Sequence, residues 1–358
     1  MALRGRNGFV PPFRIITRFV QILTLVRAVI LAGGYGKRIM PLTHYKCKPM
    51  LPVANRPALD YAVSRLRAAG IRDITFALGY KPYDVVDFAE GYTDINVSYS
   101  VEDEPLGTAG AVKLAAGGCD DDIVVCSADT LDDCDLTDML ELHRRSGAIA
   151  TIETTEVEDL GPYGEVIADG GRVLGLREKL PENAGRRGIA NTGTYVLSAR
   201  ALGYVPGGVP FDFAKDLFPY LLKLGRLICE MRSRGYWRDI GSLSDYYAAN
   251  FDMKRGYPFP AAKHLSRPYC MSVNGNLVAE SARVCGRIRN CIIGEGAIVA
   301  SSAKLESCVV LPGEVVTGSG CGCVIGRDFS LDPLLSGVNL KNAHDTSNIF
   351  RLFTSINL

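Results

Sequence analysis

The segment that most constrains this chain is an apolar run followed at once by a glycine-rich turn, VRAVILAGGYGKRIMPLTHYKCKPMLPV, at residues 26–53. Val29, Ile30 and Leu31 suit a strand buried on both faces, as in a parallel sheet. Glycines directly after a strand let backbone N–H groups surround an anion, and the lysines and arginine that follow add positive charge. The segment therefore predicts a strand and loop that hold a polyphosphate.

Two common glycine motifs do not match this turn. A dinucleotide-binding fingerprint needs a third glycine where Ile39 stands. A P-loop needs glycine at Leu31 and serine or threonine at Arg38. The loop belongs to neither class.

The segment instead resembles the signature of sugar-1-phosphate nucleotidylyltransferases. The match consists of GGYGKR from Gly33, PLT from Pro41 and KPMLP from Lys48, and this spacing is more specific than a lone glycine-rich turn. The resemblance implies that an NTP and a sugar 1-phosphate react to give an NDP-sugar and pyrophosphate. It implies that Arg38 binds the pyrophosphate leaving group and that Lys48 binds the α-phosphate. It also implies substrate contacts from Leu31, Ala32, Gly33, Gly34 and Gly36.

Later motifs extend the resemblance to about residue 255. A predicted helix opens with LGT of EPLGTAGAV, and in the resembled family this stretch contacts the nucleotide base; its residues here are Leu106, Gly107 and Thr108. Asp129 ends a third apolar strand and Asp239 lies in GYWRDIG. Both match the family's metal-holding carboxylates, so the resemblance implies Mg²⁺ as cofactor, which prefers hard oxygen ligands. Ala128 stands where the family has glycine.

Sugar-contacting positions of the family also have counterparts in this chain. Gly164 matches a sugar-contacting glycine, and Glu178 and Lys179 match the pair that holds a sugar hydroxyl and the sugar phosphate. The proline that follows this pair in the family is displaced to Pro181. The NTG segment, with Asn191 and Thr192, matches the lining of the sugar pocket.

The choice of nucleotide and sugar stays open between several readings. EPLGTAGAV, FDFAKDLFP and GYWRDIG most resemble mannose-1-phosphate guanylyltransferases, which favours GTP and mannose 1-phosphate. A glucose-1-phosphate thymidylyl- or uridylyltransferase is the alternative. A catalytically weak regulatory paralogue that binds sugar nucleotides is a third reading. Ala128 and the altered loop after Lys179 favour it, whereas retention of Asp129 and Asp239 opposes it.

The alternation of predicted strands and helices indicates an α/β fold with a Rossmann-like, mostly parallel sheet and helices on both faces. For example, the pattern predicts a helix over Pro57–Ala69 and a strand over Ile74–Leu78. Prolines after residue 257 mark a linker. We expect an N-terminal extension at 1–25, a catalytic domain at 26–257, hexapeptide repeats at 265–330 and a C-terminal tail at 331–358.

Beyond the linker, Ile293, Val299, Leu305 and Leu311 fall six residues apart. A six-residue apolar period is typical of a β-helix with one side of a triangular coil per repeat. We therefore expect a short left-handed β-helix that packs against the catalytic domain or a second subunit and makes the protein a homo-oligomer. No histidine within the repeats is placed for acyl transfer.

The composition excludes few classes of protein but suggests where in the cell the protein resides. A net charge of +1 gives no pull toward nucleic acid or membrane, although ten Lys or Arg and no Asp or Glu precede Asp60. Eleven cysteines without paired CxxC spacing suit a reduced, cytoplasmic protein. The apolar stretch at 19–26 imitates a signal peptide, but cleavage there would endanger the first strand. We expect a loosely ordered extension or an over-long gene start.

Overall fold

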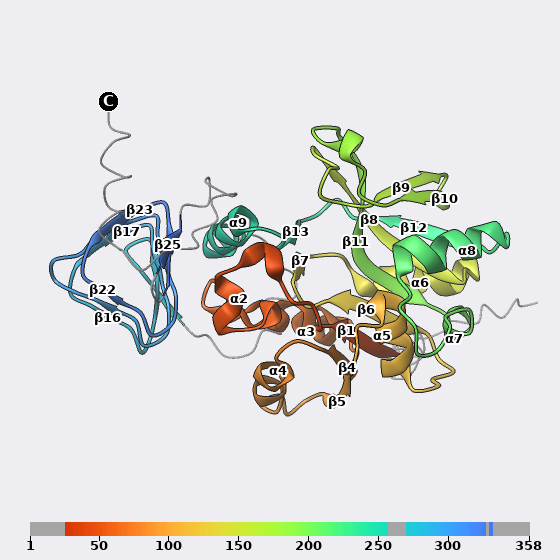
Figure 1. The fold of residues 1–358 in the computed structure, drawn as a ribbon, viewed down its shortest axis with the longest axis horizontal. Helices are drawn as coiled ribbons and strands as arrows, with labels where there is room; N and C mark the ends of the chain where they lie inside the picture. Colours follow the sequence, from red (N-terminus) through yellow and green to blue (C-terminus); the bar gives the residue numbers. More distant parts are fainter. Residues whose placement is uncertain (1–25, 257–269, 327–328, 332–358) are drawn as a thin grey trace, which may run out of the picture.

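The computed structural model of the chain describes residues 26–256, 270–326 and 329–331. The expectations for the N-terminal extension, the proline-containing linker and the C-terminal tail from residue 332 concern residues outside this part of the chain. The described residues form an α/β part at 26–256 and a coil of short strands that begins at Cys270 (Figure 1). Within these ranges, no helix is long and apolar enough to cross a membrane.

A nine-stranded sheet forms the centre of the α/β part. Ala28 and Ile30 of β1 pack on one face and Val29 on the other, because successive side chains of a strand alternate. The apolar run is thus a strand buried on both faces, as predicted. The strands, in order across the sheet, are β5 (Asn96–Val101), β4 (Asp73–Leu78), β1 (Arg27–Leu31), β6 (Ile123–Ser127), β11 (Gly188–Leu197), β8 (Ala150–Val157), β12 (Ile228–Arg232), β10 (Arg172–Arg177) and β9 (Glu165–Asp169).

Helices pack on both faces of the sheet, as predicted (Figure 1). One face carries α3 (Ala58–Ala68), α4 (Pro82–Ala89) and α6 (Leu136–Ser146). The opposite face carries α5 (Gly107–Ala116), α7 (Ala199–Leu202) and α8 (Phe218–Lys223), and a π-helical turn at Phe213–Leu217 leads into α8. The remaining helices are α2 (Leu42–Tyr45) and α9 (Leu243–Lys254), with 3₁₀ turns at Lys37–Ile39, Lys48–Met50 and Pro181–Asn183.

The sheet is mixed: seven of its nine strands run in one direction, in keeping with the prediction of a mostly parallel sheet, and β10 and β11 run against them. β5, β4, β1 and β6 run parallel, but β11 is antiparallel to β6 and β8, and β10 is antiparallel to β12 and β9. β9 and β10 are joined by a tight turn at Gly170 and Gly171, both with positive φ. Such a short turn can join only antiparallel strands, since a parallel pair needs a long crossover.

Two small ribbons beside the sheet carry or support residues of the site. β7 (Thr130–Asp132) pairs antiparallel with β13 (Trp237–Asp239), which places Thr130 opposite Asp239. β2 (Pro52–Val53) and β3 (Arg56–Pro57) form a hairpin whose two turn residues, Ala54 and Asn55, have positive φ. Both ribbons are separate two-stranded sheets and are not part of the nine-stranded sheet.

The coil consists of three small sheets whose strands pair mainly in parallel. Paired residues in successive turns, such as Leu277, Ile292 and Val309, lie 15 or 17 residues apart. The strands are β14 (Cys270–Val273), β15 (Asn276–Ala279), β16 (Arg283–Val284), β17 (Arg287–Arg289), β18 (Ile292–Ile293), β19 (Ile298–Val299), β20 (Lys304–Glu306), β21 (Val309–Val310), β22 (Val315–Val316), β23 (Ser319–Cys321), β24 (Val324–Gly326) and β25 (Phe329–Leu331).

The interior of the coil follows the predicted six-residue period only in part. Ile293, Val299 and Leu305 are buried together inside the coil. The next member of this apolar column is Val310, five residues after Leu305, whereas Leu311 packs against the α/β part. The predicted place of Leu311 is therefore wrong, because the turns have 15 or 17 residues and not a constant multiple of six.

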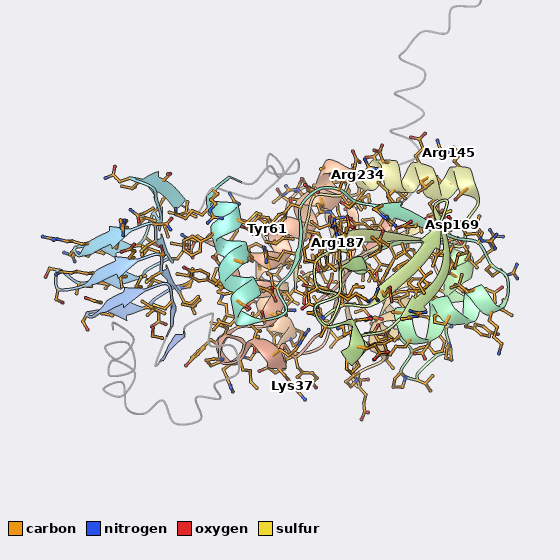
Figure 2. The ribbon with its side chains drawn as sticks, turned by 90° about the horizontal axis from the view of Figure 1, so that it is seen from above. Lys37, Tyr61, Arg145, Asp169, Arg187 and Arg234 are labelled. Atoms are coloured by element: carbon orange, nitrogen blue, oxygen red, sulfur yellow. The ribbon has the colours of Figure 1, made fainter. Side chains whose placement is uncertain are left out.

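One apolar cluster joins the coil to the α/β part, and we call it the shared cluster. In Figure 2, α9 stands between the two parts, with Tyr61 beside it. Hydrogen bonds also cross the contact, from Asn55 Nδ2 to Ile293 O (2.8 Å) and from Tyr247 OH to Ser307 O (2.6 Å). The cluster consists of Ile39, Leu42, Leu51, Val53, Ala58, Tyr61, Leu131, Tyr236, Ile240, Tyr246, Ala249, Phe251, Ile292, Val309 and Val324.

Candidate functional site

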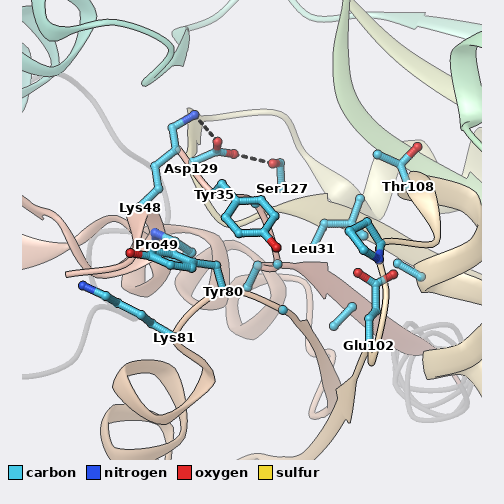
Figure 3. Close-up of a pocket in the computed structure, with 18 of the residues that line it drawn as sticks. Leu31, Tyr35, Lys48, Pro49, Tyr80, Lys81, Glu102, Thr108, Ser127 and Asp129 are labelled. Atoms are coloured by element: carbon cyan, nitrogen blue, oxygen red, sulfur yellow. Dashed lines mark hydrogen bonds and ion pairs between the residues drawn. The ribbon is translucent and has the colours of Figure 1, made fainter. Parts of the chain in front are cut away.

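A cavity of about 580 Å³ opens at the carboxyl ends of β1, β4 and β6. This edge is where open α/β sheets bind ligands, and the volume suits a small organic molecule. In Figure 3, Lys48 and Lys81 lie toward one end and Glu102 and Thr108 toward the other. The lining residues are Leu31, Ala32, Gly33, Gly34, Tyr35, Lys48, Pro49, Ala77, Gly79, Tyr80, Lys81, Glu102, Asp103, Pro105, Gly107, Thr108, Ala111, Ser127, Asp129 and Asp212.

The glycines of the turn after β1 allow close backbone packing. A Cβ added to Gly33 would lie 3.2 Å from the backbone nitrogen of Gly79, at the end of β4. Gly36 has φ +61°, and an added Cβ would lie 2.7 Å from Cγ2 of Thr43. The Thr43 hydroxyl donates to the Gly36 carbonyl at 3.1 Å, which fixes the turn. Gly34 has open space around it, so a ligand can approach its backbone.

The side chain of Lys48 lies between the two predicted metal-holding carboxylates. Its ammonium donates to Asp129 and lies 3.5 Å from Asp239 (Figure 3 shows the first contact). The β7–β13 ribbon brings the carboxylates together, since Ile240 N donates to Asp129 O at 3.0 Å. The Ser127 hydroxyl donates to the other oxygen of Asp129. The sequence-predicted trio of Lys48, Asp129 and Asp239 is therefore assembled in one place.

The charges in this trio shift one another's pKa values. Burial alone would lower the pKa of Lys48, but the charges of Asp129 and Asp239 outweigh it and raise the pKa. Burial would raise the pKa of Asp129, yet the charge of Lys48 and its hydrogen bond lower it. The pKa of Asp239 is raised, first by burial and then by the charge of Asp129. Two partly buried carboxylates that share one ammonium would gain from a further cation.

Whether these residues fit a divalent cation depends on their donor atoms. Asp129 and Asp239 offer hard carboxylate oxygens, and both face the point now held by the Lys48 ammonium. Among the described residues, no group of three or more His, Cys, Asp or Glu could hold a metal ion. Mg²⁺ usually binds one or two carboxylates and completes its shell with waters and substrate phosphates, so the two carboxylates fit it.

The opposite end of the cavity is built by the start of α5. Gly107 has φ +70°, and an added Cβ would lie 2.7 Å from Phe211 O. The Thr108 hydroxyl donates to Asp212 at 2.8 Å. Glu102 follows β5, and its carboxylate accepts from Leu106 N at 3.3 Å. Burial raises the pKa of Glu102, which this N–H lowers in part.

None of the predicted sugar-side residues lines the cavity. A Cβ on Gly164 would lie 3.2 Å from Glu178 Oε2 and 3.9 Å from Asn191 Cβ, so these three meet. Lys179 is exposed. The Thr192 side chain is buried and donates to Glu153 Oε2 at 3.0 Å. The Thr192 hydroxyl therefore bonds inside the protein and does not face the cavity.

The cavity includes eight of the seventeen predicted site residues. These are Leu31, Ala32, Gly33, Gly34, Lys48, Gly107, Thr108 and Asp129. Arg38, Gly36, Leu106 and Asp239 lie outside its lining. Arg38 is exposed, but its charge reaches Asp239 and lowers that pKa in part.

Sequence reasoning missed several lining residues. Tyr35 and Tyr80 form a ring pair with centroids 5.3 Å apart, and Lys81 follows them at the start of α4. Glu102 follows β5, and Asp212 caps the π-helical turn by accepting from Ala214 N. Tyr80 follows the predicted strand Ile74–Leu78 by two residues, and Glu102 directly follows β5. The rule that ligands bind at the carboxyl ends of such strands could have found both.

Ala128 does not intrude on the site. Its side chain is buried in the apolar core that packs against α3 and α6, and it is absent from the cavity lining. Its backbone N–H donates to Leu31 O at 3.0 Å. The methyl group that replaces the family's glycine therefore points into the core. It gives no support to a loss of activity.

Comparison with known proteins assigns this fold and site to a class. A family model described as Nucleotidyl transferase matches residues 27–256, and the chain belongs to this family. The protein is therefore a nucleotidyltransferase, an enzyme that moves a nucleotidyl group between phosphates.

Individual relatives agree with this class. The chain is 32% identical over 308 residues to the mannose-1-phosphate guanylyltransferase of Mycobacterium tuberculosis, covering 84% of this chain and 83% of the relative. It is 33% identical over 241 residues to the UTP–glucose-1-phosphate uridylyltransferase of Synechocystis, covering 63% and 62%. The crystal structure of HddC from Yersinia pseudotuberculosis complexed with GMP-PN superposes with a TM-score of 0.55 at 29% identity. That match covers 63% of this chain and 99% of HddC.

Proposed function

We propose that this enzyme transfers a guanylyl group from GTP to mannose 1-phosphate, giving GDP-mannose and pyrophosphate. The Mycobacterium tuberculosis relative, which matches most of both chains, carries this activity in its name. The observation that carries the proposal is Glu102, a carboxylate at the end of the cavity opposite Lys48.

Glu102 distinguishes nucleotide bases by hydrogen bonding. An ionised carboxylate only accepts hydrogen bonds, with two oxygens. Guanine presents N1–H and its N2 amino group side by side, so both donors can reach one carboxylate. Uracil and thymine present a single N3–H between two carbonyl oxygens, which would repel the carboxylate. A base held between Glu102 and the start of α5 is therefore best matched by guanine.

The reaction needs little covalent chemistry from the protein, because its main obstacle is repulsion between two phosphates that must align. Arg38 holds the pyrophosphate that leaves, and Lys48 holds the α-phosphate. Lys179 holds the attacking sugar phosphate, while Glu178, Gly164 and Asn191 line the sugar side. Asp129 and Asp239 would hold Mg²⁺, which supplies positive charge against the phosphates. Backbone N–H groups of the glycine turn cradle the remaining phosphate oxygens.

The test is a matrix of pyrophosphate-release assays with GTP, UTP, dTTP, ATP and CTP against mannose 1-phosphate and glucose 1-phosphate. We expect GTP with mannose 1-phosphate to give the highest kcat/KM. Glu102→Gln should lower kcat/KM for GTP by about tenfold, because an amide can accept from only one of the two donors. Glu104→Gln is the matched control, since Glu104 is exposed and does not line the cavity. A wild type that prefers UTP or dTTP would refute the assignment.

A second candidate is transfer of a uridylyl group from UTP to glucose 1-phosphate. The relative from Synechocystis supports it at similar identity over a shorter stretch. The same assay matrix decides between the two. Under this candidate, Glu102→Gln would leave the preference for UTP intact or increase it.

We also infer that the coil is a left-handed β-helix through which copies of the chain associate. Support comes from its outer face on β16, β19 and β22, where Ile298 is 40% and Val315 63% exposed. Light scattering on the full chain and on the double variant Ile298→Lys, Val315→Lys tests the association. We expect a larger species for wild type and a monomer for the variant. Equal masses for the two would contradict this interface.

A further inference from the structure

A cluster of buried ionisable side chains lies outside the cavity lining and has no role in the proposed transfer. Arg65 of α3, Asp132 of β7 and Glu153 of β8 are 5%, 0% and 0% exposed. Arg65 Nη1 donates to Asp132, and Arg65 Nη2 lies 3.9 Å from Glu153 Oε2. None of the three is among the lining residues of the cavity.

The cluster also binds the irregular part of β11. The pairing of β11 with β8 shifts register between Asn191 and Tyr195. Within that interval, the Thr192 hydroxyl donates to Glu153 Oε2 at 3.0 Å and the Thr194 hydroxyl donates to Asp132 Oδ2 at 3.2 Å. The cluster therefore connects α3, β7, β8 and the irregular stretch of β11.

Two of these connections lead directly into the site. Asp132 and the metal-holding Asp129 lie three residues apart, and β7 joins them. Thr192 lies between Asn191, on the sugar side, and Gly193. A Cβ on Gly193 would lie 4.0 Å from Cβ of Ser127. The cluster thus connects the sugar-side stretch of β11 to the strand that follows Asp129.

The cluster is not explained by its effect on stability. Among the described residues, Arg65 Nε, Arg65 Nη2 and Glu153 Oε1 are buried without a hydrogen-bond partner. Buried polar atoms without partners are unfavourable, and apolar side chains of similar volume would avoid them. A positioning role would explain why charged residues occupy this place.

We propose that Arg65, Asp132 and Glu153 are positioning residues that hold Asn191 at its distance from Asp129 and so set the affinity for the sugar part of the substrate. The inference rests on the proposed transfer to a sugar 1-phosphate. The hydrogen bonds and ion pairs of the three residues go to β7, β8, β11 and Cys134, within the described part of the chain. The nucleotide end of the cavity, at Glu102 and Thr108, is built by other elements.

The experiment measures the binding of GDP-mannose and GTP to the full chain by calorimetry, with melting curves for every variant. Glu153→Val removes the carboxylate acceptor of the Thr192 hydroxyl and leaves it only the Glu153 backbone carbonyl, at 3.1 Å. We expect GDP-mannose to bind about tenfold more weakly or worse, while GTP changes by less than about twofold. Glu153→Gln keeps the acceptor and should restore both affinities. Thr151→Val is the control, because it breaks another buried bond of β8, to His143 Nδ1 at 2.9 Å, away from the site.

A folded Glu153→Val variant that binds GDP-mannose as wild type does, or loses both ligands equally, would overturn the proposal. So would an equal loss in Thr151→Val. If Glu153→Val does not fold, Thr192→Val removes only the hydroxyl and should give the same split. A wrong substrate assignment would give a different result, already visible in the wild type. Wild type would then bind UDP-glucose and UTP in place of the guanine ligands, and the same variants would be compared with that pair.

Discussion

At the scale of single residues, the charge balance of the site depends on Lys48. Its ammonium is shared by Asp129 and Asp239, and the pKa of Asp239 stays raised because burial and a second carboxylate act on it. Binding of Mg²⁺ and phosphates would add both positive and negative charge at this point. The ammonium of Lys48 thus neutralises part of the charge of the two carboxylates, and the proposed function gives the same side chain the α-phosphate to bind.

Replacing either carboxylate tests this arrangement. Asp129→Asn and Asp239→Asn each remove one negative charge with little change of shape, so the metal should bind less tightly and phosphate repulsion should increase in the transition state. We expect turnover to fall about a thousandfold, which corresponds to about 4 kcal/mol. Pyrophosphate release measures the rate, and melting curves check the fold. Asp135→Asn is the control, since Asp135 only caps α6 and asparagine caps as well. Near-normal rates in both site variants would contradict the metal assignment.

Two glycines of the turn should respond differently to alanine. Gly36 has φ +61° and no room beside Thr43, so Gly36→Ala should destabilise the protein by about 1–3 kcal/mol. Gly34 has open space around its Cβ position, so Gly34→Ala should leave stability unchanged but raise KM for the NTP, because the methyl group faces the cavity. Urea unfolding and NTP titrations measure the two effects. Equal stability of the two variants would show that the turn is not strained as described.

At the scale of elements, the β7–β13 ribbon is what assembles the site. It places Asp239 opposite Thr130, next to Asp129, although the two aspartates are 110 residues apart in the sequence. Each strand has only three residues, too few for an apolar period to be recognised. The residues could therefore be predicted from their motifs, whereas their pairing could not be predicted from local patterns.

The same contrast holds for the main sheet. The first strand and the helices over 57–116 could be predicted, because a continuous apolar run indicates a buried strand and apolar residues at helical spacing indicate a helix. The two reversed strands could not, since the direction of β10 and β11 depends on tight turns and on distant partners. Asp212 was missed for a related reason. It is an ordinary acidic residue in the sequence and becomes part of the site only through the fold.

The contact of the coil with the α/β part leads to a prediction about two isoleucines. Ile292 is 1% exposed in the shared cluster, whereas Ile298 is 40% exposed on the outer face. We expect Ile292→Ala to lower the free energy of unfolding by about 2–4 kcal/mol and Ile298→Ala by less than about 1 kcal/mol. Urea unfolding curves of both variants measure the difference. Similar values would show that the coil does not pack on the α/β part through this face.

At the scale of the whole molecule, the shared cluster makes the coil part of the support of the site. Leu51 follows Lys48, Leu131 follows Asp129 and Ile240 follows Asp239 in the sequence, and all three pack in the cluster that includes Ile292 of the coil. Protein interiors are close-packed, so a small displacement of one side chain is transmitted to its neighbours. A change at the coil, such as association with another copy, can therefore reach the residues that carry the chemistry.

The stability of the whole molecule should also depend on pH through Glu153. Burial and the charge of Asp132 raise its pKa well above the usual value, while Arg65 opposes this shift. The thiols of Cys126 and Cys134 also face this group. In the unfolded chain Glu153 loses its proton near pH 4.3, whereas the folded chain keeps it to higher pH. The folded state thus binds more protons, so the free energy of unfolding falls as pH rises through this window.

Glu153→Gln removes this dependence, because glutamine does not titrate and keeps an acceptor for Thr192. We expect the stability of the variant relative to wild type to increase by up to about 1.4 kcal/mol per pH unit above pH 4.3, until the folded pKa of Glu153 is reached. Urea unfolding of both proteins between pH 5 and 8 gives this difference, in which the other titrating groups largely cancel. Glu158→Gln, at an 86% exposed side chain, is the control and should give a flat difference. A flat difference for Glu153→Gln as well would mean that Glu153 is ionised in the folded protein, with Arg65 compensating both carboxylates.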